Sequence, residues 1–315
     1  MITVFDELQR SHDPQFFLSS GAAQPCPEKP ARIDALLGGV KRLGGPIVAP
    51  PDSGIEPIRA VHPDRYLTFL QTIFTRWQRI EGASAEVIPN IHPATRNDGY
   101  PKSAVGQAGF HMTDTSCPIG AETWAAAYAS AQTAIHAADL VLGGERAVYA
   151  LSRPPGHHCF SDLAGGFCYL NNSAIAAERL VKAGRRVAIL DVDLHHGNGT
   201  QGIFYDRGDV LTISLHAHPE RFYPFFWGYP EERGTDEGEG ANLNLALERG
   251  TGDEGFLAAL DRGLEALTRH GADTLVLALG LDAFEGDPFA GLKVTTPGFR
   301  QIGRGRVFMQ AMVLR

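Results

Sequence analysis

Long apolar runs, basic clusters and paired cysteines are all scarce in this sequence. The longest apolar run, residues 274–281, is much shorter than the roughly 20 residues that cross a bilayer, and no signal peptide is apparent at the N-terminus. The 28 Lys and Arg residues are scattered and outnumbered by 36 acidic residues, so the net charge of −8 argues against a nucleic-acid partner. The four cysteines lack C-x-x-C spacing, which favours a reducing cytoplasm.

Strand-like and helix-like segments alternate over most of the 315 residues. Apolar runs at residues 146–151, 187–190, 210–215 and 274–281 are typical of parallel strands covered on both faces. Helices are predicted over residues 121–142, 173–182 and 254–269. This alternation predicts an α/β fold, a three-layer, doubly wound and mainly parallel sheet with helices on both faces. Since no linker or repeat is visible, we expect one domain over residues 1–315.

One segment, residues 78–102, does not fit the alternation. It contains three prolines and mixed charge, and it is predicted to be irregular. A long irregular insert in a compact domain usually has a function or contacts another subunit.

Polar residues follow three of the predicted strands, in the blocks RPPGHH, DVDLHHGNG and GLDAFEGDP. Ligands of open α/β sheets bind beyond the carboxyl ends of the strands. Asp191, Asp193 and His195 alternate, so in an extended run their side chains point to one side. Adding Asp282 gives one imidazole and two carboxylates in Asp193, His195 and Asp282, a set typical of catalytic zinc. Nitrogen and oxygen ligands without thiolate also suit Fe²⁺.

Each of these residues alone has a simpler interpretation. A single Asp after a strand often caps a helix, and a lone His is more often a buried core residue than a ligand. The combination at three strand ends favours a site. The pair His157-His158 is then suited to proton transfer, with Asp191 and Asn198 as candidate orienting partners.

These blocks, together with GGFCYLNNSAIAA and TISLH, resemble the arginase-fold zinc deacetylases. Within this arginase/histone deacetylase superfamily, the chain is similar to histone deacetylases and more closely to bacterial acetylpolyamine amidohydrolases. The resemblance implies a zinc-dependent hydrolase that removes acetyl groups from small acetylated amines. Two alternatives remain: a broader deacylase acting on acetyl-lysine, and a zinc-binding relic without turnover.

The resemblance implies three zinc ligands, Asp193, His195 and Asp282. His158 would act as general base and acid and pair with Asn198. His157, held by Asp191, would be its electrostatic partner. The second Asp that a two-metal arginase needs is replaced by Phe284, so a single metal is expected.

The resemblance also implies substrate contacts and a second cation. Gly166 would offer its carbonyl oxygen to the scissile amide N–H, and Phe167 and Tyr223 would form walls of the tunnel. A structural K⁺ site is matched by three positions: Asp191, Ser214 and the backbone around Leu215. Residues 78–102 match the insert through which these amidohydrolases dimerise and narrow the tunnel, so a homodimer is expected.

Two positions depart from the family pattern. The family polarises the substrate carbonyl with a Tyr in a Gly-Gly-Tyr loop after the last core strand, whereas no Tyr follows Tyr229 here. After Gly303 we expect neither that strand nor the loop, and therefore an altered C-terminal segment and weak activity. At the tunnel mouth, Val105 and Ser116 stand at the positions of family glutamates, and Asp114 is a candidate substitute for attracting a cationic chain.

Overall fold

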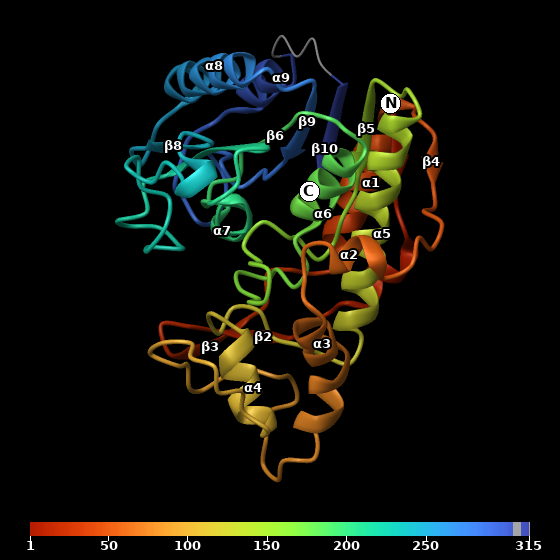
Figure 1. Cartoon of the computed structure of the whole chain (residues 1–315), viewed down its shortest axis with the longest axis vertical. Coiled ribbons are helices and arrows are strands. Elements are labelled where there is room, and N and C mark those ends of the chain that lie inside the picture. The colour runs from red at the N-terminus through yellow and green to blue at the C-terminus, as the bar shows by residue number, and fades with distance from the viewer. Residues whose placement is uncertain (305–309, 315) are drawn as a thin grey trace. The chain divides into compact units, whose positions relative to one another are not determined.

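The computed structural model describes residues 1–304 and 310–314 (Figure 1). The chain divides into two compact units, each made of two segments. The first unit comprises Met1–His136 and Leu151–Ile175, and the second comprises Ala137–Ala150 and Ala176–Arg315. The expectation of a single deacetylase domain over residues 1–315 stays a prediction.

The second unit is built on a parallel sheet. Its strands follow one another in the order β5 (Ala147–Ala150), β10 (Gln310–Leu314), β9 (Thr274–Ala278), β6 (Val187–Asp191), β7 (Val210–Ala217) and β8 (Asn242–Leu247). Every neighbouring pair is parallel, so the consecutive pairs β6–β7, β7–β8 and β9–β10 must be joined by crossover connections. The predicted strands at 146–151, 187–190, 210–215 and 274–281 are confirmed.

Helices cover both faces of this sheet. Along β7, successive side chains point to opposite faces of the sheet. Ile213 and Leu215 therefore lie on one face, and Thr212 and Ser214 lie on the other. A Cβ placed on Gly263 of α8 (Asp253–His270) would lie 3.2 Å from the Ile213 side chain, so α8 packs on that face. On the other face, Thr212 and Ser214 share a small cavity with residues of α7 (Asn198–Phe204). The predicted α/β architecture is confirmed (Figure 1).

The two helices predicted over residues 173–182 and 254–269 are confirmed. α6 (Asn172–Lys182) and α8 coincide with the predicted helices, and α8 ends at Gly271, whose φ of 72° is left-handed. α9 (Thr296–Arg304) packs against α8. The core between α8 and the sheet is formed by buried apolar side chains that include Leu190, Leu211, Ile213, Leu215, Phe256, Leu260, Leu267 and Leu275.

The expectation that no strand follows Gly303 is wrong. Residues 310–314 form β10, which pairs in parallel with β5 on one side and β9 on the other. The run QAMVL has little β-branched character, so its local propensity does not indicate a strand, and pairing with two neighbours decides its conformation. Of the segment expected to be altered, residues 305–309 and 315 lie outside the described residues.

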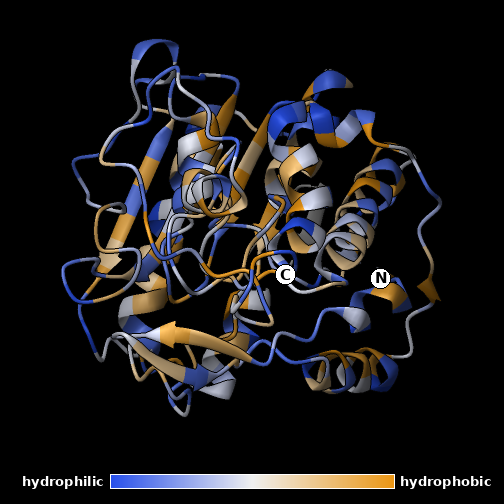
Figure 2. Ribbon diagram, turned by 90° about the horizontal axis from the view of Figure 1, so that it is seen from below, coloured by the Kyte–Doolittle hydropathy of each residue, from blue (hydrophilic) through white to orange (hydrophobic). Residues whose placement is uncertain are grey.

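The first unit contains short strands, which pair two by two, and several helices. β1 (Ile2–Val4) pairs in parallel with β4 (Ile47–Val48), and β2 (Phe16–Ser19) forms an antiparallel hairpin with β3 (Ala22–Pro25). The helical elements are η1 (Glu7–Ser11), α1 (Ala31–Leu43), α2 (Glu56–Arg59), α3 (Asp64–Trp77), α4 (Ala104–His111) and α5 (Thr123–Leu142), the last continuing into the second unit. Figure 2 shows helical ribbons that alternate between hydrophobic and hydrophilic colour, as expected when one face is buried.

Residues 78–102, hereafter the insert, contain no helix and no strand, as predicted. A single bridge between Val87 and Ile119 links the insert to the segment before α5. All four cysteines are buried free thiols. Within the described residues, none of the helices is both long enough and apolar enough to cross a membrane.

Candidate metal centre and active site

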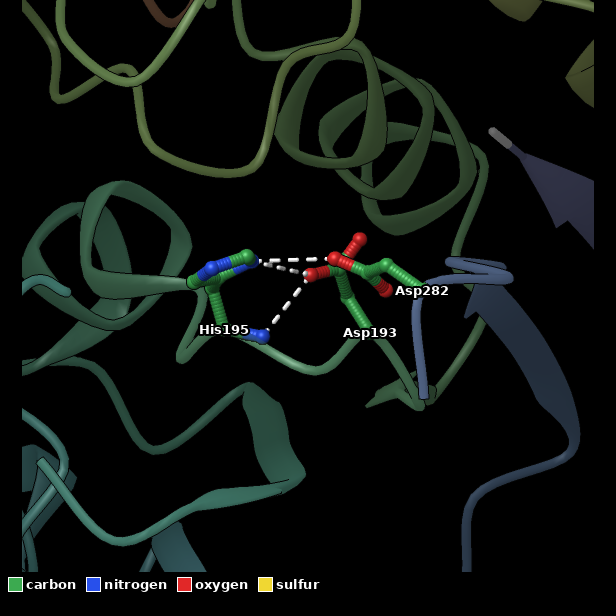
Figure 3. A group of neighbouring side chains, drawn as sticks. All are labelled: Asp193, His195 and Asp282. Atoms are coloured by element: carbon green, nitrogen blue, oxygen red, sulfur yellow. Dashed lines mark hydrogen bonds and ion pairs between the residues drawn. The ribbon is translucent and has the colours of Figure 1, made fainter. Parts of the chain in front are cut away.

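The second unit brings together the three predicted metal ligands. His195 Nδ1 lies 2.9 Å from Asp282 Oδ2 and 3.3 Å from Asp193 Oδ1. One ligand atom from each residue lies within 4.8 Å of those of the other two, and Figure 3 shows the imidazole turned toward both carboxylates. Asp193 and His195 follow β6, and Asp282 follows the adjacent strand β9, so neighbouring strand ends create the cluster. Its side chains are 14–20% exposed, which leaves them accessible to a ligand.

Backbone donors fix the orientation of both carboxylates. The N–H of Leu194 donates to Asp282 Oδ1 at 2.9 Å, and the N–H of His195 donates to Asp193 Oδ1 at 2.8 Å. Close packing behind the cluster depends on Gly280, because a Cβ there would lie 2.2 Å from Asp193 Oδ2. The ligands are therefore held by backbone geometry as well as by one another.

The electrostatics of the cluster favour an added cation. Burial alone would lower the pKa of His195, but its hydrogen bonds with Asp193 and Asp282 outweigh burial and raise it to about 10. Burial, followed by the nearby charge of Asp193, raises the pKa of Asp282. Two carboxylates thus compete for one imidazolium, and a divalent ion would balance the charge of both. The donor set of one nitrogen and two carboxylate oxygens fits zinc with an open position, and also fits Fe²⁺.

Aromatic rings flank the imidazole. The ring of Tyr223, a predicted wall residue, lies with its centroid 6.3 Å from that of His195. Phe289 lies closer, at 5.0 Å and nearly perpendicular, and is 50% exposed. The sequence reasoning missed Phe289. The signal was present, because Phe289 lies only seven positions after Asp282, just beyond the Asp-Pro turn of the same strand end.

The three residues of the predicted K⁺ site lie in neighbouring strands. Asp191 ends β6 and pairs in register with Ser214 of β7, and Leu215 follows in the same strand, fully buried. Asp191 and Ser214 line the same small cavity. Ser214 Oγ lies 2.8 Å from His216 Nδ1, and His216 Nε2 lies 2.8 Å from the carbonyl oxygen of Gly228. Among the described residues, the metal cluster does not include Asp191, although strict alternation would have placed it beside Asp193.

The predicted proton-transfer residues divide between the units. His157 and His158 belong to the first unit, where their ring centroids lie 3.9 Å apart and His158 is buried. The start of their loop is anchored by Arg153, whose Nε donates to Glu28 Oε1 at 2.7 Å. Asn198 belongs to the second unit, where it is the buried first residue of α7.

The predicted substrate-contact residues of the first unit have left-handed backbone angles. Gly166 has φ of 50° and Phe167 has φ of 66°, a value uncommon for a residue other than glycine. The Gly166 N–H donates to Asp114 Oδ2 at 3.0 Å, and the Phe167 ring makes an edge contact with Phe17 at 5.6 Å. Asp114, the candidate for attracting cationic substrate, also accepts from the Ser116 N–H at 2.7 Å. Its carboxylate therefore has a structural part in this loop.

Comparison of the sequence with known proteins identifies the family to which it is similar. The model of the histone deacetylase domain matches residues 26–312. The chain is 44% identical over 304 residues to the acetylpolyamine amidohydrolase of Burkholderia pseudomallei, covering 96% of this chain and 89% of the relative. It is 40% identical over 307 residues to the acetylpolyamine amidohydrolase of Mycoplana ramosa, covering 96% of this chain and 90% of the relative.

Solved structures agree with the sequence comparison. The crystal structure of acetylpolyamine aminohydrolase from Burkholderia pseudomallei superposes with a TM-score of 0.96 at 42% identity, covering 100% of this chain and 92% of that one. The HD domain of HDA15 gives a TM-score of 0.79 at 27% identity, covering 100% of this chain and 84% of that one.

Proposed function

The chain belongs to the histone deacetylase domain family, and from this premise we propose that it is a zinc-dependent amidohydrolase that releases acetate from small acetylated amines, above all acetylpolyamines. The observation that carries the proposal is the cluster of Asp193, His195 and Asp282 at adjacent strand ends. The relatives that match 96% of the chain are named for this activity, which supports the choice of substrate class.

Asp193, His195 and Asp282 would hold the metal, with His195 contributing Nδ1, the ring nitrogen that faces both carboxylates. When bound, zinc supplies a Lewis acid that polarises a carbonyl oxygen and acidifies water. Fe²⁺ could occupy the same donor set. The backbone donors to both carboxylates keep their remaining oxygens in place, which favours one fixed ligand geometry.

His158 is the proposed proton carrier. It accepts a proton from the water that attacks the acetyl carbonyl carbon, and it returns that proton to the amine nitrogen as the C–N bond breaks. Water and amide are thereby converted to acetate and free amine. We assign His157 as the electrostatic partner of His158, with Asp191 and Asn198 orienting the two imidazoles. The close contact of the two rings supports a shared role.

Substrate binding is assigned to the two loops that carry aromatic residues. The Gly166 carbonyl oxygen would accept the scissile amide N–H, and Phe167 and Tyr223 would exclude water from the acyl chain. Phe289 is added to this wall, since its ring is the nearer of the two beside His195. Aromatic walls with few polar groups are typical of sites that bind a narrow aliphatic chain.

Relative turnover of two substrates tests the substrate class. We expect kcat/KM for N-acetylputrescine to exceed that for an acetyl-lysine peptide, because the net charge of −8 favours a small cationic amine. The uncharged analogue N-butylacetamide is the control for the cationic end. A strong preference for the peptide would instead support a broader acetyl-lysine deacylase. Zinc bound at about one ion per chain, with no turnover of any acetyl amide, would identify a relic.

Three further assignments are part of the proposal. Asp191, Ser214 and the backbone at Leu215 form a structural K⁺ site, supported by their in-register pairing across β6 and β7. The insert mediates a homodimer, which sedimentation of the purified chain tests. The cytoplasm is the assigned location, since a reducing compartment maintains four free thiols.

A further inference from the structure

A charged and aromatic cluster in the first unit joins the insert to the loop of residues 161–168. Arg96 of the insert donates to both carboxylate oxygens of Asp162, with 2.7 Å between Nη1 and Oδ1. Arg65 of α3 lies 3.8 Å from the same carboxylate. The guanidinium groups of Arg96 and Arg65 also lie over the ring of Phe110, at 4.2 and 5.2 Å from its centroid. A two-pronged guanidinium–carboxylate pair fixes direction as well as distance.

A second connection runs from the insert to the same loop through a buried histidine. His111 Nδ1 lies 2.8 Å from the carbonyl oxygen of Asp162, and His111 Nε2 lies 3.0 Å from the hydroxyl of Tyr100. Burial lowers the pKa of His111 to about 4, so the ring is neutral at pH 7. A carbonyl can only accept, so Nδ1–H donates to Asp162 and Nε2 accepts from Tyr100. Two residues of the insert are therefore connected to Asp162. Arg96 binds its carboxylate directly, and Tyr100 is linked to its carbonyl oxygen through His111.

The loop continues from Asp162 along the end of α4. The Ala164 N–H donates to the His111 carbonyl oxygen at 2.8 Å, and the Thr113 N–H donates to the Ala164 carbonyl oxygen at 2.7 Å. Two residues later the chain reaches Gly166 and Phe167, with their left-handed backbone angles. Such a conformation at Phe167 persists only where the surrounding contacts over-determine it. The Arg96–Asp162 pair is one of those contacts, at the start of the same loop.

We propose that Arg96 is a positioning residue, which acts through Asp162 to hold the 161–168 loop in the conformation that receives substrate. The insert thereby sets substrate affinity from within its own chain, apart from any part it has in dimer formation. This inference rests on the proposed function in one respect, namely that Gly166 and Phe167 contact the substrate.

The expected kinetic effect falls on KM and spares kcat. Without the ion pair, the loop occupies the receptive conformation for only a fraction of the time, and the apparent dissociation constant rises by the inverse of that fraction. Once the substrate is bound, the loop is in its receptive form and the chemical step is unchanged. For loss of one partly buried pair we expect KM to rise roughly five- to tenfold.

The experiment compares Arg96→Gln, Asp162→Asn and the double variant in the full chain, with N-acetylputrescine as substrate. Arg179→Gln is the matched control, since Arg179 makes a 2.7 Å ion pair with Asp139 in the second unit. We expect a similar rise in KM for both single variants and no further rise in the double variant, with kcat within about twofold of wild type. Arg96→Lys keeps the charge and loses the two-pronged contact, so its KM should be intermediate.

Hydrogen exchange of the peptide spanning residues 160–169 provides a readout that needs no activity. Arg96→Gln should speed exchange there, and Arg179→Gln should not. Unchanged exchange and KM, additive effects in the double variant, or a KM rise that appears only with a changed sedimentation coefficient would overturn the proposal. If the wild-type chain turns over no acetyl amide but exchange still responds to Arg96→Gln, the positioning role stands and the proposed function alone fails.

Discussion

Gly280→Ala is expected to disable the metal centre while the fold persists. A Cβ at this position would lie 2.2 Å from Asp193 Oδ2 and 2.5 Å from Asp193 Cα. Ordinary contacts are near 3.5 Å, so one group must move by roughly 1 Å. Rotation of the Asp193 side chain cannot relieve the contact with its own Cα. Metal–ligand distances vary by only about 0.2 Å around their preferred values, so Asp193 would be displaced from ligand position.

Zinc affinity should fall by about 100-fold or more. This is at the upper end of the losses in metal affinity caused by mutating residues that support a metal ligand. Competition with a chromogenic chelator measures the zinc dissociation constant, and thermal unfolding of both apoproteins measures the fold. Gly303→Ala in α9 is the control, because a Cβ there has no atom within 4 Å. A Gly280→Ala chain that binds zinc as tightly as wild type would refute the steric account of this centre.

Three other predictions concern catalysis and stability. His158→Ala should lower acetate release by about 10²–10⁴ while leaving zinc content unchanged, and retained activity would exclude His158 as the proton carrier. Burial lowers the pKa of His62 to about 4, against 6.5 in the unfolded chain, so the free energy of unfolding rises with pH between these two values. We expect the contribution of His62 to this free energy to be about 2 kcal/mol smaller at pH 5 than at pH 7. Urea unfolding should show a shallower pH dependence for His62→Gln, and an identical dependence would contradict this. The family resemblance implies a Tyr-bearing loop after the last core strand, so a chain extended by a Gly-Gly-Tyr segment after β10 should have a kcat about 10²–10³-fold above that of residues 1–315 alone; equal rates would count against an oxyanion donor there.

The cluster of proposed metal ligands could be predicted because its residues follow strand ends directly in the sequence. Polar residues that follow continuous apolar runs are visible in sequence, and the carboxyl ends of parallel strands share one sheet edge. The adjacency of β6 and β9 could not be predicted from sequence, because strand order depends on long-range pairing. Asp191, which alternates with Asp193 and His195 in the sequence, lies outside the cluster of three, where β6 ends and the chain bends at residues 193–195.

Other elements escaped prediction because tertiary contacts determine them. β10 has weak strand propensity and forms between two partners, and the β1–β4 pair involves a strand of only two residues. The contact between Arg96 and Asp162 spans 66 positions, and nothing in either local sequence indicates the other. From the sequence alone, Gly280 cannot be distinguished from an ordinary turn glycine, because its contact with Asp193 is known only from the structure.

Titration of the metal-free chain with zinc, followed by acetate release from N-acetylputrescine, tests the central claim most directly. The account predicts that activity rises linearly with added zinc and stops rising at one ion per chain, because Asp193, His195 and Asp282 form one site. The same titration of Asp282→Ala should give no rise over that range. Hydrolysis that is independent of zinc, or a fully loaded chain that releases no acetate, would contradict the account.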